Sequence, residues 1–258
     1  MTMVMEYIGR WLANYLEKPS RKYQPFGVYD ISTLQAFLQP ADILLVEGNQ
    51  RVSVAIKYLT QSTWSHSALY VGDINGSNAP MLVEADLADG VITVPLSKYA
   101  SFNTRICRAV GLTSADQKKV IDFALNHVGH GYDLKNVIDL ARYLLPTPPV
   151  PVRWRRRMLA LGSGDPTRAI CSTLIAQAFQ SVGYPILPTV ERRREQASSG
   201  YGYVEREFLH IRHHSLFAPR DFDLSPYFRV VKPTVEHGFD HHALHWADVD
   251  KNKKLSGL

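Results

Sequence analysis

Residues 64–71 read WSHSALYV, and the alternation of their side chains indicates a β-strand in the core of the protein. In a strand, every second side chain points to the same face, so His66 would lie beside Ala68 and Tyr70. A histidine on a core strand is commonly a buried residue with a satisfied hydrogen bond, so this position alone does not define a functional site. The role of His66 must therefore be inferred from the segments around the strand.

Further elements follow from the hydrophobic periodicity on both sides of this strand. Apolar runs bounded by turn residues predict strands at residues 41–48, 81–86, 90–96 and 103–110. Helical spacing of apolar residues predicts helices at residues 3–17, 52–59, 114–128, 133–145 and 168–182, and Ser114 with Gln117 has the spacing of a capping box. We expect an α+β fold in which an antiparallel sheet, or a partial barrel, packs against helices.

The composition is that of a globular protein. The chain has 258 residues, of which 45% are hydrophobic and 21% are charged, and no apolar run approaches the ~20 residues that cross a bilayer. The first residues lack the features of a secretory signal, so we expect a cytoplasmic protein, with secretion without a cleaved signal left open. Two cysteines, Cys107 and Cys171, are too few for a disulfide framework.

The net charge of +5 is modest, but the basic residues are clustered. One cluster ends a proline-rich stretch at residues 146–157, which predicts an extended surface loop, and another comprises Arg192–Arg194. Neither cluster contains a motif that reads RNA or DNA, so no nucleic-acid partner is expected and an exposed loop is the simpler interpretation. An anionic substrate or peripheral contact with an anionic membrane stays open, and the oligomeric state is not indicated.

Cys171 lies at the predicted start of a helix in the stretch RAICSTLIAQAFQSVGYP, residues 168–185. Free N–H groups and the positive end of the helix dipole stabilise a thiolate there, and the same amides could hold an oxyanion. Cys107 instead alternates with Ile106 and Arg108 along a strand, as a structural cysteine would. Cys171 is thus the candidate nucleophile, although a buried structural cysteine is the alternative at this stage.

A cysteine nucleophile needs a histidine to accept its proton, and that histidine needs an acceptor that fixes its orientation. Among ten histidines, His66 is the one that we place on a core strand. The next predicted strand contains Glu84 in the apolar stretch LVEAD, and an antiparallel hairpin could place it beside His66. A carboxylate in an apolar strand needs a partner, which favours this pairing.

Several segments, taken in order, resemble a known family. They are ADILLVEG, TWSHSALYVGD, LVEAD, GYDLKN, AICSTLIAQAF and APRDFDLSPYFRVVKP, and they span residues 38–233. This order resembles the permuted papain-like cysteine hydrolases of the NlpC type, particularly the YiiX/YebB-like subgroup, in which the histidine precedes the cysteine. The resemblance implies a permuted papain-like fold.

The resemblance also implies roles for individual residues. Cys171 corresponds to the nucleophile, His66 to the general base and acid, and Glu84 to the group that orients His66. Asp42 is expected to support the His66 strand, and Tyr132 to contact the substrate or the oxyanion.

The implied reaction is cleavage of an amide (peptide-like) or ester bond through a thioester acyl-enzyme. A thioesterase or acyltransferase acting on lipids is the alternative, and a binding protein with a vestigial site is the third interpretation. No cofactor is expected. Trp64 and Ser65, next to the histidine, are expected to bind substrate or to support the site. The apolar side chains of Trp64, Phe208, Leu209 and Phe217 could line an acyl groove.

The chain divides, on this interpretation, into three parts. Residues 1–20 form an N-terminal helical extension, residues 21–233 form the catalytic domain, in which residues 217–228 pack across the core, and residues 234–258 form a histidine-rich tail. In the tail, His237, His241 and His245 are four residues apart and would share a face of a continuous helix. Glycine at position 238 weakens such a helix, so we predict no metal there.

Overall fold

The computed structural model describes residues 29–74, 79–86, 89–130, 170–196 and 203–243, together with positions 18, 25 and 76. Several predictions lie outside these described residues, and they remain predictions. They concern the helices at residues 3–17 and 133–145, the loop at residues 146–157, Tyr132, and His245.

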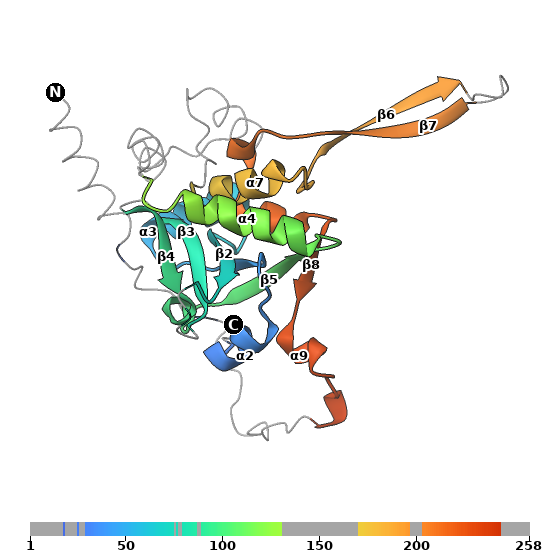
Figure 1. The fold of residues 1–258 in the computed structure, drawn as a ribbon. Coiled ribbons are helices and arrows are strands. Elements are labelled where there is room, and N and C mark those ends of the chain that lie inside the picture. The colour runs from blue at the N-terminus through green and yellow to red at the C-terminus, as the bar shows by residue number, and fades with distance from the viewer. Residues whose placement is uncertain are drawn as a thin grey trace, which may run out of the picture.

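Among the described residues, the fold is built on a six-stranded antiparallel sheet with the strand order β4-β3-β2-β1-β5-β8 (Figure 1). Strands β4 and β8 form its two edges, so the sheet is open there. The α+β class that we expected is confirmed. The strands are β1 (Ile43–Val46), β2 (His66–Gly72), β3 (Met81–Asp86), β4 (Gly90–Pro95), β5 (Thr104–Ala109) and β8 (Phe228–Val231).

Helices were predicted correctly at residues 52–59, 114–128 and 168–182, with small differences in their bounds. The helices are α2 (Ile31–Phe37), α3 (Arg51–Thr60), α4 (Ser114–Asn126), α7 (Ile170–Ser181), α8 (Pro219–Leu224) and α9 (Pro233–Glu236), with 3₁₀ turns η1 (Leu96–Tyr99), η2 (His214–Leu216) and η3 (His241–Ala243). The predicted capping box of Ser114 with Gln117 was wrong, because Ser114 is the first residue of α4 and not its N-cap. Thr113, which precedes α4, is the N-cap, and its hydroxyl accepts the amide of Asp116 at 3.1 Å.

Both faces of the central strand β1 are covered, which explains why its sequence ILLV is apolar throughout. On one face, Ile43 and Leu45 pack in a cluster with residues of α4 and α7. On the other face, Leu44 and Val46 pack with residues of α2 and η1. Figure 1 shows α4 and α7 lying across the sheet on the first of these faces. The central strands are thus held rigidly from both sides.

The segment at residues 217–228 packs across this core, as expected. Phe217, Phe222 and Phe228 belong to the same cluster as α7, and β8 continues the segment by pairing with β5. Helix α8 begins in a capped turn, where the carboxylate of Asp221 accepts the amide of Ala218 at 2.9 Å. The segment is therefore part of the domain that carries the sheet.

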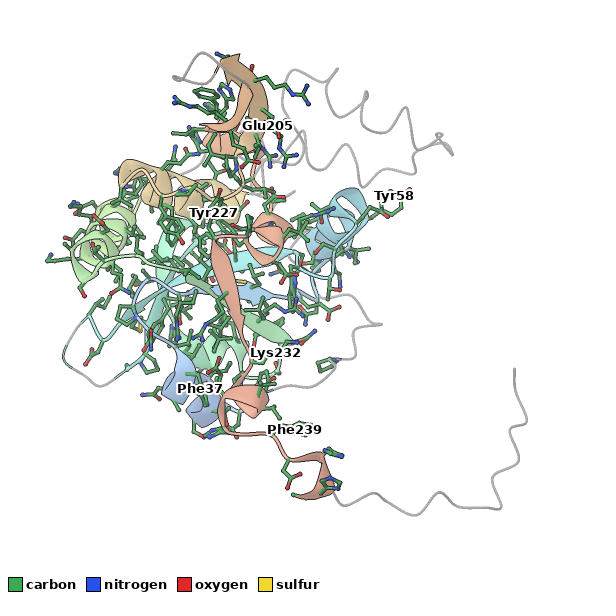
Figure 2. All side chains as sticks on the ribbon, turned by 90° about the vertical axis from the view of Figure 1, so that its right-hand side faces the viewer. Phe37, Tyr58, Glu205, Tyr227, Lys232 and Phe239 are labelled. Atoms are coloured by element: carbon green, nitrogen blue, oxygen red, sulfur yellow. The ribbon has the colours of Figure 1, made fainter. Side chains whose placement is uncertain are left out.

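A two-stranded hairpin was not predicted from the sequence. Strands β6 (Thr189–Gln196) and β7 (Tyr203–His210) form a ribbon that extends away from the sheet (Figure 1). Arg192–Arg194 are exposed, as expected, but they lie on β6 and not in a loop. Charged residues are poor strand formers, but opposite charges facing each other across a ribbon stabilise it, as Arg192 and Glu207 do at 3.0 Å. Figure 2 shows the side chains of this ribbon around Glu205.

The first residues of the C-terminal tail return to the body of the protein. The ring of His237 packs edge-on against Phe37 of α2, with ring centroids 4.6 Å apart, near the position that Figure 2 labels. Helix α9 ends at Glu236, and Gly238 follows with a positive φ of 83°. His237 and His241 therefore do not share a helix face. The division of the chain at residues 20 and 233 stays a prediction.

Among the described residues, none of the helices is both long enough and apolar enough to span a membrane.

The packing of residues 217–228 predicts unequal effects of two substitutions in α8. Phe222→Ala should lower the free energy of unfolding by about 3–5 kcal/mol, because it leaves a cavity beneath the helix. Leu224→Ala in the same helix should change it by less than about 1 kcal/mol, because the Leu224 side chain is 55% exposed. Urea denaturation measures both. Similar losses for the two variants would show that α8 does not pack on the core as described.

Candidate active site

His66 and Glu84 lie on neighbouring strands. His66 is the first residue of β2, and Glu84 is in the middle of β3. The strands are antiparallel with Leu69 opposite Val83, so His66 and Glu84 face the same side on a diagonal. The Nε2 atom of His66 lies 3.1 Å from Oε2 of Glu84, whose side chain is 0% exposed. The sequence thus anticipated this contact, although the two residues are not directly opposite.

Cys171 lies in the first turn of α7, and its side chain is 4% exposed. Its thiol is hydrogen-bonded to the ring of His66 and also interacts with the backbone of Ser67. Because Nε2 of His66 faces Glu84, the other ring nitrogen is left for the sulfur. The structure therefore brings Cys171, His66 and Glu84 together in one chain of contacts.

The charges of these three groups stabilise one another. Burial alone would raise the pKa of Cys171, but the positive charge of His66 and its hydrogen bond outweigh burial and lower the pKa below the ordinary 9.0. Burial alone would lower the pKa of His66, but Cys171 and Glu84 raise it to about 10. Burial opposes ionisation of Glu84 as well, and His66 and Lys98 nevertheless lower its pKa to about 2. The favoured state is a thiolate beside an imidazolium.

Two further residues contact Glu84, and sequence reasoning missed both. Lys98 donates a hydrogen bond to Oε1 of Glu84, and the hydroxyl of Tyr99 donates one to Oε2. Both residues belong to η1, which follows β4, the strand paired with β3. The only signal in the sequence is a lysine and a tyrosine in the turn that ends this hairpin, while the carboxylate in the hairpin still needs donors.

The side chains of Trp64 and Ser65, which precede His66 in the chain, make hydrogen bonds within the protein. The indole N–H of Trp64 donates to Asp223 at 3.2 Å, and the ring lies buried under the guanidinium of Arg105. The hydroxyl of Ser65 accepts the amide of Gly48 at 2.9 Å and is buried. Both side chains make internal contacts. Whether they bind substrate or support the site stays a prediction.

Asp42 lies away from the thiol and the imidazole. Its carboxylate accepts two hydrogen bonds from the guanidinium of Arg108, at 2.8 and 2.7 Å, and its backbone carbonyl accepts the amide of Tyr70 at 2.8 Å. Tyr70 is on β2, four residues beyond His66. Asp42 therefore contacts the His66 strand at its far end.

The four apolar residues that could have formed an acyl groove do not all line one surface. Trp64 and Phe217 are buried in the core, whereas Phe208 and Leu209 lie on β7. A cavity of about 260 Å³ is lined by Leu209 and Phe217 together with residues 183–188, which follow the C-terminal end of α7. Cys171 is at the other end of that helix, so this cavity is not part of the site around the thiol.

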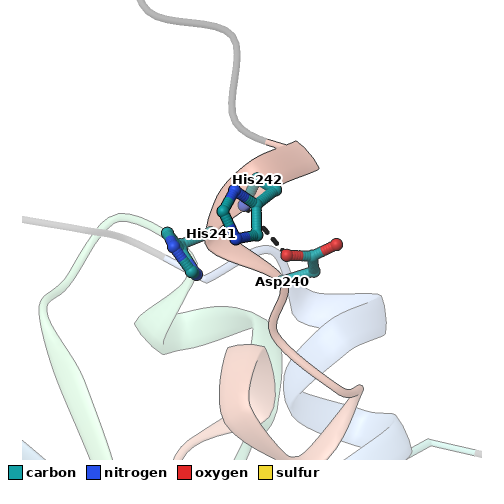
Figure 3. Close-up of side chains that lie close together, drawn as sticks. All are labelled: Asp240, His241 and His242. Atoms are coloured by element: carbon teal, nitrogen blue, oxygen red, sulfur yellow. Dashed lines mark hydrogen bonds between the residues drawn. The ribbon is translucent and has the colours of Figure 1, made fainter.

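A group of possible metal ligands lies in the tail. Asp240, His241 and His242 are exposed, and their ligand atoms lie within 4.8 Å of one another (Figure 3). One carboxylate oxygen of Asp240 already accepts the backbone amide of His242 at 2.9 Å. The group comes from three consecutive residues and differs from the spacing of four that the sequence suggested.

Comparisons with known proteins found a family and one curated relative that are similar in sequence to the chain. Residues 37–143 match the model of a family described as a permuted papain-like amidase enzyme, YaeF/YiiX, C92 family. The probable lipoprotein peptidase YaeF of Escherichia coli (strain K12) is 23% identical over 165 residues, which cover 58% of this chain and 58% of that relative. The chain thus matches little more than half of that relative's length.

A solved structure is also similar to the chain. The crystal structure of the metalloprotein yiiX from Escherichia coli O157:H7 is matched with 18% identity and a TM-score of 0.45, over 75% of this chain and 96% of that one. The residues matched by the family model include His66 and Glu84, whereas Cys171 lies beyond them. The chain is similar to permuted papain-like amidases, and the observed α+β fold is consistent with theirs.

The two cysteines should differ in reactivity. Burial, reinforced by the charge of Asp223, raises the pKa of Cys107, whereas His66 lowers that of Cys171. Iodoacetamide at neutral pH should therefore label Cys171 faster than Cys107, by about tenfold or more. The rate at Cys171 should rise with pH around a midpoint below 9.0. Peptide mass spectrometry follows both sites, with the urea-unfolded protein as the control; equal rates in the folded protein would contradict the assigned environment.

Proposed function

We propose that this protein is a papain-like cysteine hydrolase that cleaves a peptide-like amide bond. Cys171 is the nucleophile, His66 is the general base and acid, and Glu84 orients His66. The observation that carries the proposal is the hydrogen-bonded chain from the Cys171 thiol through the His66 ring to the buried Glu84 carboxylate. The similarity to an amidase family supports it independently.

Acylation begins from the thiolate and imidazolium pair. The sulfur of Cys171 attacks the carbonyl carbon, and the carbonyl oxygen takes the electron pair and becomes an oxyanion. The amides at the start of α7 are suited to stabilise that charge. As the carbon–nitrogen bond breaks, His66 gives its proton to the leaving amine, and a thioester on Cys171 remains.

Deacylation uses His66 in the opposite sense. Neutral His66 accepts a proton from water, and the resulting hydroxide attacks the thioester carbonyl. The carbon–sulfur bond then breaks, the carboxylic acid leaves, and the thiolate is restored beside the imidazolium. Glu84 stays ionised throughout, since its low pKa keeps it from accepting the proton. Its role is to hold the ring and to stabilise the positive charge on it.

A peptide-like substrate is favoured because the matched family is described as an amidase and the YaeF relative is named as a peptidase. Membership of the NlpC type and of the YiiX/YebB-like subgroup is part of the same proposal. The YaeF relative is named as a lipoprotein peptidase, so the cytoplasmic location expected for this chain stays a prediction. Hydrolysis of esters by the same chemistry is compatible with the proposal.

A panel of activated peptide-like amides, esters and acyl thioesters tests the proposal by intact-mass detection of an adduct on Cys171. Turnover of amides with an acyl-enzyme supports it. Acylation by lipid esters or thioesters alone would replace it with a lipid-directed thioesterase or acyltransferase. A folded protein that none of the panel labels would be a binding protein with a vestigial site. Cys171→Ser is the control, because it removes the thiol and preserves the size of the side chain.

Substitution of the histidine and of its partner should have graded effects. His66→Ala should raise the pKa of Cys171 and nearly abolish turnover, because both the proton acceptor and the positive charge are lost. Glu84→Gln should lower kcat by about a hundredfold or more, with a smaller effect on KM. The double variant should be little worse than His66→Ala, because the residues act as a unit. Steady-state kinetics and alkylation rates measure these effects.

The control for these variants is His210→Ala, which removes an exposed histidine of the β6–β7 hairpin. It should leave the kinetics and the thiol unchanged. If His66→Ala lowers the melting temperature but leaves the pKa of Cys171 unchanged, His66 is a structural residue of the core and not the base.

A further inference from the structure

The carboxylate of Glu84 contacts two further side chains besides His66. His66 and Tyr99 both contact Oε2, and Lys98 contacts Oε1. The carboxylate is fully enclosed, whereas the Lys98 side chain is 40% exposed. Lys98 therefore links a buried negative charge to the surface of the protein.

The four ionised groups alternate in sign along one line of contacts. The line consists of the thiolate of Cys171, the imidazolium of His66, the carboxylate of Glu84 and the ammonium of Lys98. Without Lys98, the remaining three groups would carry a net negative charge in a largely buried place. Such a charge is costly, and binding a proton at the thiolate or at the carboxylate would relieve it.

Tyr99 contributes to the same carboxylate without adding charge. Its ring is buried and packs edge-on against Phe102, with centroids 5.8 Å apart, so its hydroxyl has a fixed position. Burial and the negative charge of Glu84 raise the pKa of Tyr99 far above its ordinary value. The phenol thus stays a donor and fixes the rotation of the carboxylate.

We propose that Lys98 is a positioning residue that acts through Glu84 to keep Cys171 in the thiolate form. The inference rests on the proposed function for its purpose, but its physical content concerns only the thiol. Lys98 compensates the charge of Glu84, and Glu84 in turn holds His66 as the positive partner of the sulfur. Tyr99 holds the carboxylate in the orientation that allows both contacts.

The test measures the pH midpoint of Cys171 alkylation by iodoacetamide in the full-length protein. Lys98→Met should move the midpoint upward by roughly half a pH unit to one unit, a shift reduced by the exposure of the ammonium to solvent. Lys98→Arg should keep the midpoint close to that of the unmodified protein, because the guanidinium retains the positive charge. Tyr99→Phe keeps every charge and should move it less than Lys98→Met. Lys118→Met removes a 75% exposed lysine on α4 and should leave the midpoint unchanged.

The dependence on Glu84 is tested in a second background. In Glu84→Gln, Lys98 has lost its charged partner, so Lys98→Met should add no further shift. The same shift in both backgrounds would mean that Lys98 acts on the thiol directly and would overturn the inference. An unchanged midpoint in Lys98→Met, with a melting temperature that shows a folded protein, would also overturn it. If Lys98→Met does not fold, Lys98→Gln replaces it under the same criteria.

The outcomes separate this inference from the proposed function. A midpoint that responds to His66 but not to Lys98 would reject the inference alone. A midpoint that responds to both residues, in a protein that turns over none of the substrate panel, would reject the proposed hydrolase and support the inference.

Discussion

The negative charge of Glu84 inside the sheet is the constraint on which the rest of the site depends. A carboxylate without water is stable only where donors surround it, and here those donors are His66, Lys98 and Tyr99. They come from β2 and from η1, which lie on either side of β3 in the chain. A slip of β3 by one residue would turn Glu84 to the opposite face, among the apolar side chains that pack on α7. Only the observed register of β3 therefore places the charged Glu84 side chain beside its three donors.

The segment that contains α8 connects the two halves of the site. The hydroxyl of Ser172, next to the nucleophile in the first turn of α7, donates to the carbonyl of Phe217 at 2.6 Å. Asp223, in the last turn of α8, accepts a hydrogen bond from the indole N–H of Trp64, which lies two residues before His66 in the chain. The helix that carries the thiol and the strand that carries the base are far apart in sequence, but both are tied to one short segment. This arrangement limits their relative movement, as hydrogen bonding between cysteine and histidine requires.

The sequence was most informative where a local period determined the structure. Alternation placed His66 and Glu84 on strands, and the apolar face of a helix placed Cys171 in its first turn. Lys98 and Tyr99 could not be assigned in this way, because their contact depends on the path of a short turn after β4 and not on any period. The β6–β7 hairpin was missed for a related reason. Its strands are rich in charged residues of low strand propensity, and the pairing of charges across the strands becomes visible only when the register is known.

The thiolate arises from a transfer of one proton within the protein. At neutral pH an unfolded chain would hold that proton on Cys171 and leave His66 mostly neutral, given their ordinary pKa values of 9.0 and 6.5. In the folded protein the proton is on His66. At neutral pH the folded and unfolded states therefore bind the same number of protons at these two residues, so the site does not make the free energy of unfolding depend on pH. Below pH 6.5 the unfolded chain binds one more proton, so acid favours unfolding. Above pH 9.0 it binds one fewer until His66 loses its proton near pH 10. The range in which the reactive ion pair exists thus coincides with the range in which the site contributes most to stability.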